Sequence, residues 1–335
     1  MDDIAASDLK TILHSKRANI YYLEHCRVLA NGGRVEYVTD AGKRSLYWNI
    51  PIANTTSILL GTGTSITQAA MRALAKAGVL VGFCGGGGTP LFSANEMDVE
   101  VAWLSPQSEY RPTEYLQAWV AFWFDEDRRL AAAKALQQAR IRRLDWEWRQ
   151  AGLKEAGFNV HVERLESLLA QSAQRVEQAG GTVDLLTEEA RLTKALFKMA
   201  VDAVGYGEGF TRAKRGTGTD PANRFLDHGN YLAYGLGATA CWVLGLPHGL
   251  AVLHGKTRRG GLVFDVADLV KDACILPQAF LSAMRGDDEQ QFRRNCIEAL
   301  TRSESLDFMI DTVKEIAMAA SGSGVIPPSD QEGGA

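Results

Sequence analysis

The sequence predicts an α+β fold, in which a small N-terminal mostly-β domain is followed by a larger all-α C-terminal domain. Two observations predict it. β-Branched and aromatic residues alternate with turn signals over the first hundred residues, and strong helix formers with few breakers dominate after residue 112. The chain has 335 residues, of which 46% are hydrophobic, so it can fill one large or two ordinary domains. We expect the β-rich domain over 1–104, a linker over 105–112, the helical domain over 113–322 and a disordered tail over 323–335.

Short strands separated by turns account for most of the first hundred residues. The segment ANIYYLEHCRVLA is aromatic and β-branched, and the following Asn31–Gly33 is a strong hairpin signal. Further strands are expected in RVEYVT, KRSLYWNIPI, TSILLG, VLVGFC and TPLFSA. One helix interrupts them: Ser65 can cap it, Gln68 completes a capping box, and Gly78 ends it.

Helical segments fill the rest of the chain. Pro112 suits a first helical turn, and the aromatic run Trp119–Phe124 is interpreted as core rather than as a platform for stacking bases. After YLQAWVAFWF and RRLAAAKALQQARIRRLDWEWRQ, helices are expected over 163–178, 187–204, 221–244, 265–285 and 287–320.

Composition excludes several classes of protein. The formal net charge of −4 gives no global basic field, and the acidic, polar start MDDIAASDLK is unlike a secretory signal. No apolar run approaches the ~18–20 residues that span a bilayer. The five cysteines contain no CxxC pair, which argues against a structural zinc site or a disulfide framework. We therefore expect a soluble cytoplasmic protein with reduced thiols and no membrane partner.

Basic residues gather in one part of the helical domain. Between residues 205 and 261, seven Lys and Arg residues stand against three Asp and Glu residues. Clustered positive charge, rather than total charge, binds phosphates. The candidate phosphate contacts are Arg212, Lys214, Arg215, Arg224, Lys256, Arg258 and Arg259.

Two neighbouring glutamates open the helix expected over 187–204, and their helical phase separates them. Glu188 has Arg191 three residues on, as in a routine exposed ion pair. An acid at this place can simply favour the helix dipole. Glu189, however, is in line with an apolar face, and a carboxylate facing a core needs a partner because its desolvation alone is prohibitive. That face consists of Leu192, Leu196, Ala200 and Ala203.

Three aspartates follow a histidine that ends an apolar segment. A histidine such as His254 is, on its own, more often a hydrogen-bonded core residue than a ligand. In a helix, Asp265, Asp268 and Asp272 share one face. Asp265 can act as an N-cap, and Asp272, which follows Lys271, is interpreted as solvated. Asp268 is harder to explain structurally, because aspartate has a poor helix propensity and apolar residues surround it.

Together these groups predict a mixed oxygen and nitrogen site. One Glu, one His and one or two Asp suit Mg²⁺ or Mn²⁺, and the imidazole favours Mn²⁺ slightly. The basic loop over 256–259 would lie beside the site. A divalent ion next to phosphate-binding Arg and Lys is the equipment of phosphodiester chemistry.

Two other interpretations stay open. The acids can be caps and ion pairs in a non-catalytic DNA-binding scaffold. The stretch LLGTGTSITQAAMRALAKAG also has the strand, glycine turn and helix of a nucleotide fold near Gly61. It lacks the GxGxxG pattern and repeated βαβ units, so a structural role is favoured there. The segment HGKTR is not a P-loop, because Leu250 stands where that motif needs glycine.

At these residues the chain resembles the CRISPR-associated adaptation integrase family, the universal first Cas protein, historically called an endonuclease. Its type I-F version is the most similar. The resemblance covers nearly the whole chain, including IPIANTTSILLGTGTSITQAAMRALAKAGVLVGFC in the β domain, but not the tail beyond Gly322. The matching residues are Glu189 and Phe197 in EARLTKALF, Asn223 and His254 in NRFLDHGNYLAYGLGATACWVLGLPHGLAVLH, and Asp265 and Asp268 in FDVAD.

The resemblance implies a metal-dependent DNA endonuclease and integrase of CRISPR adaptation. Such a protein joins the 3′-OH ends of short DNA fragments to repeat phosphodiesters during spacer acquisition. Glu189, His254 and Asp268 are then expected to bind Mg²⁺ or Mn²⁺ in the helical domain, with Asp265 as an auxiliary catalytic acid. The implied partners are double-stranded and branched DNA, a second copy in a homodimer, and the second adaptation protein, which type I-F systems fuse to the interference helicase-nuclease.

Overall fold

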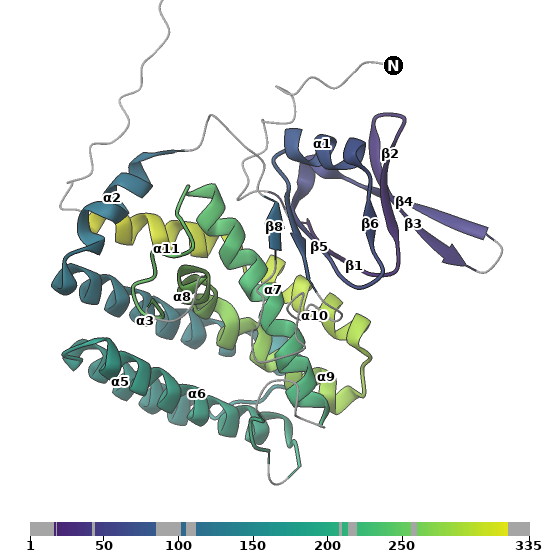
Figure 1. Cartoon of the computed structure of the whole chain (residues 1–335). Coiled ribbons are helices and arrows are strands. Elements are labelled where there is room, and N and C mark those ends of the chain that lie inside the picture. The colour runs from purple at the N-terminus through teal and green to yellow at the C-terminus, as the bar shows by residue number, and fades with distance from the viewer. Residues whose placement is uncertain are drawn as a thin grey trace, which may run out of the picture.

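The computed structural model describes residues 17, 19–41, 44–84, 102–104, 112–207, 210–213, 220–255 and 260–320. Within these residues, strands form the N-terminal part and helices the remainder, which confirms the predicted α+β class (Figure 1). The expected strand TPLFSA, the linker except Pro112, and the tail lie outside the described residues. The exact domain boundaries therefore stay predictions.

Two four-stranded sheets make up the described part of the N-terminal domain. The first has the order β1 (Asn19–Leu23), β5 (Thr55–Leu60), β7 (Leu80–Phe83) and β8 (Ala102–Leu104). The second has the order β4 (Arg44–Ile50), β3 (Arg34–Ala41), β2 (Arg27–Asn31) and β6 (Ser65–Ile66). A short 3₁₀ turn, Ile52–Asn54, precedes β5.

The predicted hairpin at Asn31–Gly33 is confirmed. Strands β2 and β3 are antiparallel with Asn31 opposite Arg34, and the turn glycines Gly32 and Gly33 have φ values of 55° and 80°. The segment ANIYYLEHCRVLA, however, is not one strand. It breaks at His25, whose φ is 48°, and the two halves enter different sheets as β1 and β2.

Parallel pairing in the first sheet was not predicted from the sequence. Strand β5 pairs in parallel with both β1 and β7, and helix α1 (Gln68–Lys76) lies on the connection from β5 to β7. The helix is capped by Thr67, whose hydroxyl accepts the Ala70 N–H at 3.2 Å. Ser65 belongs to β6, so the predicted Ser65 capping box was wrong. Gly78 ends the helix as expected, with a φ of 70°.

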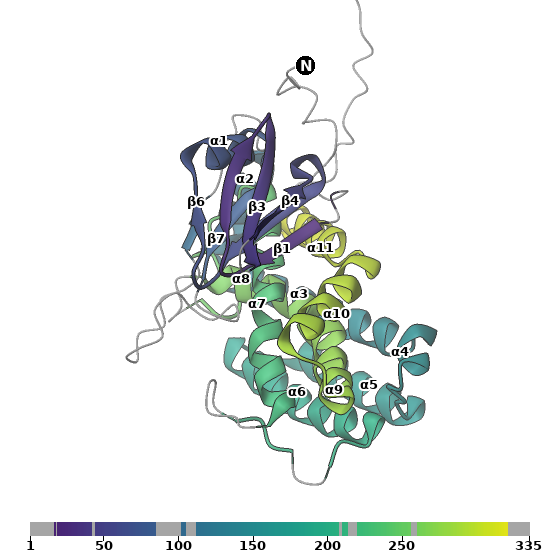
Figure 2. The same cartoon turned by 90° about the vertical axis from the view of Figure 1, so that its right-hand side faces the viewer.

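The first sheet separates two hydrophobic cores. Successive side chains of a strand point to opposite faces. Ile58 and Leu60 accordingly pack into the core of the β domain, whereas Leu59 packs into the core of the helices. The β domain therefore stands directly on the helical domain, as the turned view shows (Figure 2).

Helix α7 (Pro221–Val243) is mostly buried against the other helices of the domain (Figure 1). Gly237 lets α7 approach α8 closely, because a Cβ there would lie 2.8 Å from the Val263 carbonyl oxygen. The helices are α2 (Glu114–Trp123), α3 (Glu126–Trp148), α4 (Ala151–Glu155), α5 (Val162–Gln178), α6 (Thr182–Val204), α7 (Pro221–Val243), α8 (Gly261–Val270), a π-helical turn (Lys271–Ile275), α9 (Leu276–Arg285), α10 (Glu289–Arg302) and α11 (Ser305–Ala320).

Three predicted helices differ from those observed. Helix α6 begins at Thr182 rather than at residue 187, so Glu189 lies inside the helix and not in its first turn. The π-helical turn interrupts the segment expected over 265–285. The segment expected over 287–320 is divided at Glu304, whose φ is 47°.

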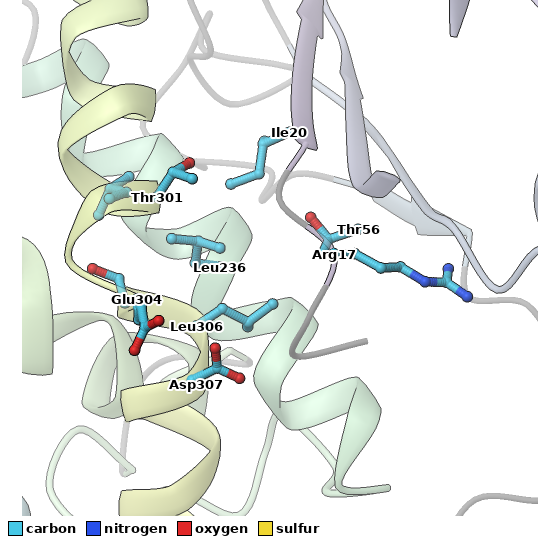
Figure 3. A pocket seen from close by; sticks show the side chains of 10 residues that line it. Arg17, Ile20, Thr56, Leu236, Thr301, Glu304, Leu306 and Asp307 are labelled. Atoms are coloured by element: carbon cyan, nitrogen blue, oxygen red, sulfur yellow. The ribbon is translucent and has the colours of Figure 1, made fainter. Parts of the chain in front are cut away.

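A cavity of about 170 Å³ lies where the β domain meets α7, α10 and α11 (Figure 3). Ile20, Thr56 and Leu236 line its apolar part, and Glu304 and Asp307 its polar part. It contains none of the predicted site residues. The five cysteines are free, as expected, and all five are buried. No described helix is both long and apolar enough to cross a bilayer.

Candidate metal centre

Three segments far apart in the sequence bring the predicted ligands together. Glu189 comes from α6, His254 from the loop after α7, and Asp268 from α8. One ligand atom from each of these residues lies within 4.8 Å of the other two. The three side chains therefore converge in the fold, which their spacing in the sequence alone did not establish.

Glu189 lies along the apolar face of α6, as its phase predicted, but not at the end of that face, because buried Leu185 precedes it by one turn. Its side chain is 15% exposed, and its carboxylate Oε2 is 3.4 Å from Nε2 of His254. Burial would raise the pKa of Glu189, but the bond with His254 and the charges of Arg140 and Lys271 lower it below its ordinary value. Glu189 is therefore held as a carboxylate inside the domain.

His254 lies between two carboxylates. Its Nδ1 is 2.8 Å from Oδ1 of Asp265, so Nε2 points to Glu189. Burial would lower the pKa of His254, but hydrogen bonds with Asp265 and Glu189 and the charge of Asp268 raise it to about 10. A carboxylate on one ring nitrogen is the usual way in which a protein orients the other nitrogen toward a metal.

Asp265 is not the N-cap that the sequence allowed, because α8 begins four residues earlier at Gly261. Its fully buried carboxylate instead holds the loop that carries His254. Oδ2 accepts the backbone N–H groups of Val252 and Leu253 at 2.8 and 3.1 Å, and Oδ1 accepts that of His254 at 3.0 Å. Asp265 thus fixes both the backbone and the ring of His254.

Two tryptophans from α2 hold the same loop from the other end. Trp119 Nε1 donates to the Leu250 carbonyl at 2.9 Å, and Trp123 Nε1 donates to the Ala251 carbonyl at 2.8 Å. The interpretation of the aromatic run as core is right for Trp119, which is buried. Sequence periodicity gave no sign that these indoles fix the histidine loop, because a side chain to backbone bond over such a separation has no local pattern.

Asp268 is buried and forms an ion pair with Lys271, three residues on. Burial would lower the pKa of Lys271, but Asp268 and the other anionic groups near it raise it. The buried mid-helix aspartate therefore has a charged partner, a contact that the scaffold interpretation also allows.

The interpretation of Asp272 as solvated was wrong. The residue is 3% exposed, and its carboxylate pairs with the guanidinium of Arg140 in α3. That interpretation rested on the adjacent Lys271, which itself pairs with Asp268 inside the domain. The helical face that Asp265, Asp268 and Asp272 share is buried at all three positions, in agreement with their spacing. Arg140 was missed, although it continues the buried stripe of Ala133, Leu136 and Leu144 on α3.

Glu188 and Arg191 form the predicted pair, with Oε2 to Nε at 2.7 Å. The pair is not routinely exposed, because Glu188 is 6% exposed and also accepts the Ser172 hydroxyl at 2.6 Å. Glu188 therefore joins α6 to α5, which lie side by side (Figure 1). Neighbouring glutamates thus face different helices, and Glu189 alone faces the centre.

Two of the candidate phosphate contacts lie in the described residues. Arg212 donates to the Asn223 side-chain oxygen at 2.7 Å and pairs with Asp227, so its guanidinium is already bound. Arg224 is exposed on α7. The other five candidates, Lys214, Arg215, Lys256, Arg258 and Arg259, lie outside the described residues.

Gly61 has a packing reason that requires no nucleotide. A Cβ at this position would lie 2.7 Å from the Tyr22 hydroxyl and 2.8 Å from Cγ of Glu24. The glycine therefore allows the end of β5 to pass close to the end of β1.

Comparisons of the sequence with a family model and with known proteins agree on one family. The family model for "CRISPR associated protein Cas1" matches residues 21–294. A protein of Pseudomonas aeruginosa named CRISPR-associated endonuclease Cas1 is 72% identical over 95% of this chain and 98% of its own length. A protein of the same name from Pectobacterium atrosepticum is 65% identical over 93% of this chain and 95% of its own length.

Solved structures share the fold. A Cas1 protein from Thermotoga maritima covers 92% of this chain and 99% of its own, with a TM-score of 0.69 at 17% identity. A casposase bound to integration product covers 90% of each chain, with a TM-score of 0.67 at 13% identity. Because the family model spans most of the sequence and two relatives are far more than half identical, the chain belongs to the Cas1 family of CRISPR-associated proteins.

Proposed function

We propose that the chain is a divalent-metal-dependent DNA endonuclease and integrase of CRISPR adaptation, similar to type I-F members of its family. The observation that supports this proposal most strongly is the cluster of Glu189, His254 and Asp268, whose ligand atoms lie within 4.8 Å of one another. The relatives from Pseudomonas and Pectobacterium carry the name endonuclease. The casposase with the same fold was captured with integration product.

The donor set fits Mg²⁺ or Mn²⁺. Two carboxylates and one imidazole form a hard, mixed oxygen and nitrogen site. The charges also fit, because a metal-bound imidazole is neutral. The cluster then contains four carboxylates (Glu189, Asp265, Asp268 and Asp272) and two cationic side chains (Arg140 and Lys271). One divalent ion would balance the two negative charges in excess.

The reaction that we propose is a transesterification. The 3′-OH of a DNA fragment attacks a repeat phosphodiester; a new phosphorus–oxygen bond forms, the bond to the repeat 3′ oxygen breaks, and that oxygen takes up a proton. A divalent ion held by Glu189, His254 and Asp268 would stabilise charge on the phosphoryl group. Asp265 keeps the Nδ1 proton of His254 engaged and so presents Nε2 as a ligand. It acts as a positioning residue and does not touch the substrate.

The proposed function also implies three binding partners: DNA, a second copy of the chain and the second adaptation protein. DNA is the substrate, and exposed Arg224 and the five basic candidates outside the described residues are proposed to contact phosphates. A homodimer is supported by the edge strand β4, which exposes Leu46, Tyr47 and Trp48 and leaves one side unpaired in the described sheet. A solved Cas6-RT-Cas1–Cas2 complex contains a chain that shares this fold over 91% of the present chain and 35% of its own, with a TM-score of 0.63, and it supports the second adaptation protein as a partner. Its fusion to the interference helicase-nuclease, and a cytoplasmic location, are parts of the same proposal.

Replacing Asp268 by asparagine tests the catalytic proposal against the alternative of a non-catalytic DNA-binding scaffold. Asp268→Asn is nearly isosteric but removes a charged ligand, so we expect fragment joining and branched-DNA cleavage to fall at least about 100-fold. Gel assays with labelled DNA in Mg²⁺ and in Mn²⁺ measure both rates. Asp311→Asn, a change at an exposed aspartate of α11, is the matched control. Normal rates in Asp268→Asn would favour the scaffold.

A further inference from the structure

Arg140 is a buried guanidinium beneath the candidate metal centre. It is 1% exposed, and its Nε donates no hydrogen bond to any described residue. Its other two nitrogens have partners: Nη2 contacts Asp272 and the Thr193 hydroxyl, the latter at 2.8 Å, and Nη1 donates to Gln137 at 3.1 Å. Burying such a charge stabilises a fold poorly compared with packing apolar side chains. The network therefore calls for a role other than stability.

The contacts of Arg140 join the two helices that carry the carboxylate ligands. On α6 it contacts Thr193, which lies one turn after Glu189, and its Nη1 is 4.0 Å from Oε1 of Glu189. On the other side it contacts Asp272, one turn after Asp268 and within the π-helical turn. One rigid, planar side chain thus spans α3, α6 and the end of α8.

A second hydrogen bond from α3 also holds Asp272. Trp148, also from α3, donates its indole N–H to the Asp272 carbonyl at 3.1 Å. A π-helical turn disturbs the regular backbone ladder, and such turns are frequent at functional sites. Helix α3 therefore holds both the carboxylate and the backbone of Asp272, and with it the end of α8 that bears Asp268.

Charge alone gives the opposite expectation for metal binding. A guanidinium 4.0 Å from a ligand carboxylate repels a divalent ion, so its removal would strengthen binding if electrostatics were its only effect. A role in positioning predicts instead that removal weakens binding, because Glu189 and Asp268 lose their common support. The sign of the change distinguishes the two effects.

We propose that Arg140, anchored on Asp272, is the positioning residue that sets the separation of Glu189 and Asp268 for one divalent ion. The inference rests on the proposed function, since it takes these residues as ligands. Arg140 touches neither substrate nor ion in this role; it acts through the carboxylates.

Calorimetric titration of the full chain with Mn²⁺ tests the inference, with thermal unfolding of each variant to identify folded samples. Arg140→Lys keeps the charge but loses the planar fork, and Arg140→Gln combined with Asp272→Asn removes both charges without leaving one unpaired. We expect the Mn²⁺ association constant to fall about tenfold in each. Thr193→Val, which removes one contact of Arg140, should lower it about threefold.

Arg143→Lys is the matched control, because Arg143 is another arginine of α3 with a mostly buried side chain, and it pairs with an acid, Glu147, away from the ligands. It should change the unfolding temperature but not the Mn²⁺ affinity. Wild-type affinity in Arg140→Lys, tighter binding in the double variant, or an equal loss in Arg143→Lys would overturn the inference. Failure of the proposed function is a separate result: wild type would not bind Mn²⁺, or Asp268→Asn would bind it as wild type does.

Discussion

At the scale of single residues, the candidate metal centre depends on the hydrogen bonds and ion pairs that hold its ligand side chains in place. His254 has a carboxylate on each ring nitrogen, and its backbone N–H is bound by the same Asp265 that orients the ring. Helical phase was sufficient to single out Glu189, and poor helix propensity among apolar neighbours was sufficient to single out Asp268. The same helical phase places Arg140 in the buried stripe of α3, so periodicity marks a buried basic residue as it marks a buried acid.

Asp265→Asn tests the support of the histidine loop. The Asp265 carboxylate contacts three backbone N–H groups and one ring nitrogen with its two oxygens. The asparagine side chain has one acceptor oxygen, and its NH₂ group would face N–H donors in place of the second oxygen. We expect the free energy of unfolding to fall by about 2–4 kcal/mol in urea titrations. The exposed change Asp311→Asn should stay within about 0.5 kcal/mol of wild type. A similarly small change for Asp265→Asn would show that the loop does not need this anchor.

At the scale of elements, the presence of the helices was predictable, whereas their ends were predictable in some helices and not in others. The limits of α5 and α7 were predicted to within one residue, because each has a clear apolar period and α7 also has Pro221 in its first turn. The start of α6 and the interruptions at the π-helical turn and at Glu304 were missed. These features depend on tertiary contacts such as those of Asp272, which have no local signature.

The start of α1 offers a direct comparison of the two capping residues. Thr67 accepts the Ala70 N–H, whereas Ser65 is an exposed residue of β6. Thr67→Ala should therefore lower the free energy of unfolding by about 1 kcal/mol. Ser65→Ala should change it by less than about 0.5 kcal/mol. Urea unfolding followed by circular dichroism measures both, and the reverse order of costs would restore the capping box that the sequence suggested.

At the scale of the whole molecule, the site exists because three parts of the helical domain meet. The β domain stands on the helices through one face of its first sheet and supplies none of the clustered ligands (Figure 2). Sequence reasoning predicted the two domains, since strand and helix patterns are local. It did not predict the parallel pairing of β1, β5 and β7 or the meeting of α6, α8 and the histidine loop. Both are products of long-range packing.

The central claim is that these three segments hold one divalent ion. A crystal soaked in Mn²⁺ and measured at a wavelength where manganese scatters anomalously tests it most directly. We expect a single strong anomalous peak about 2–2.5 Å from a carboxylate oxygen of Glu189, from Nε2 of His254 and from a carboxylate oxygen of Asp268. A fully soaked crystal with no peak between these side chains, or with its peak elsewhere on the molecule, would contradict the account.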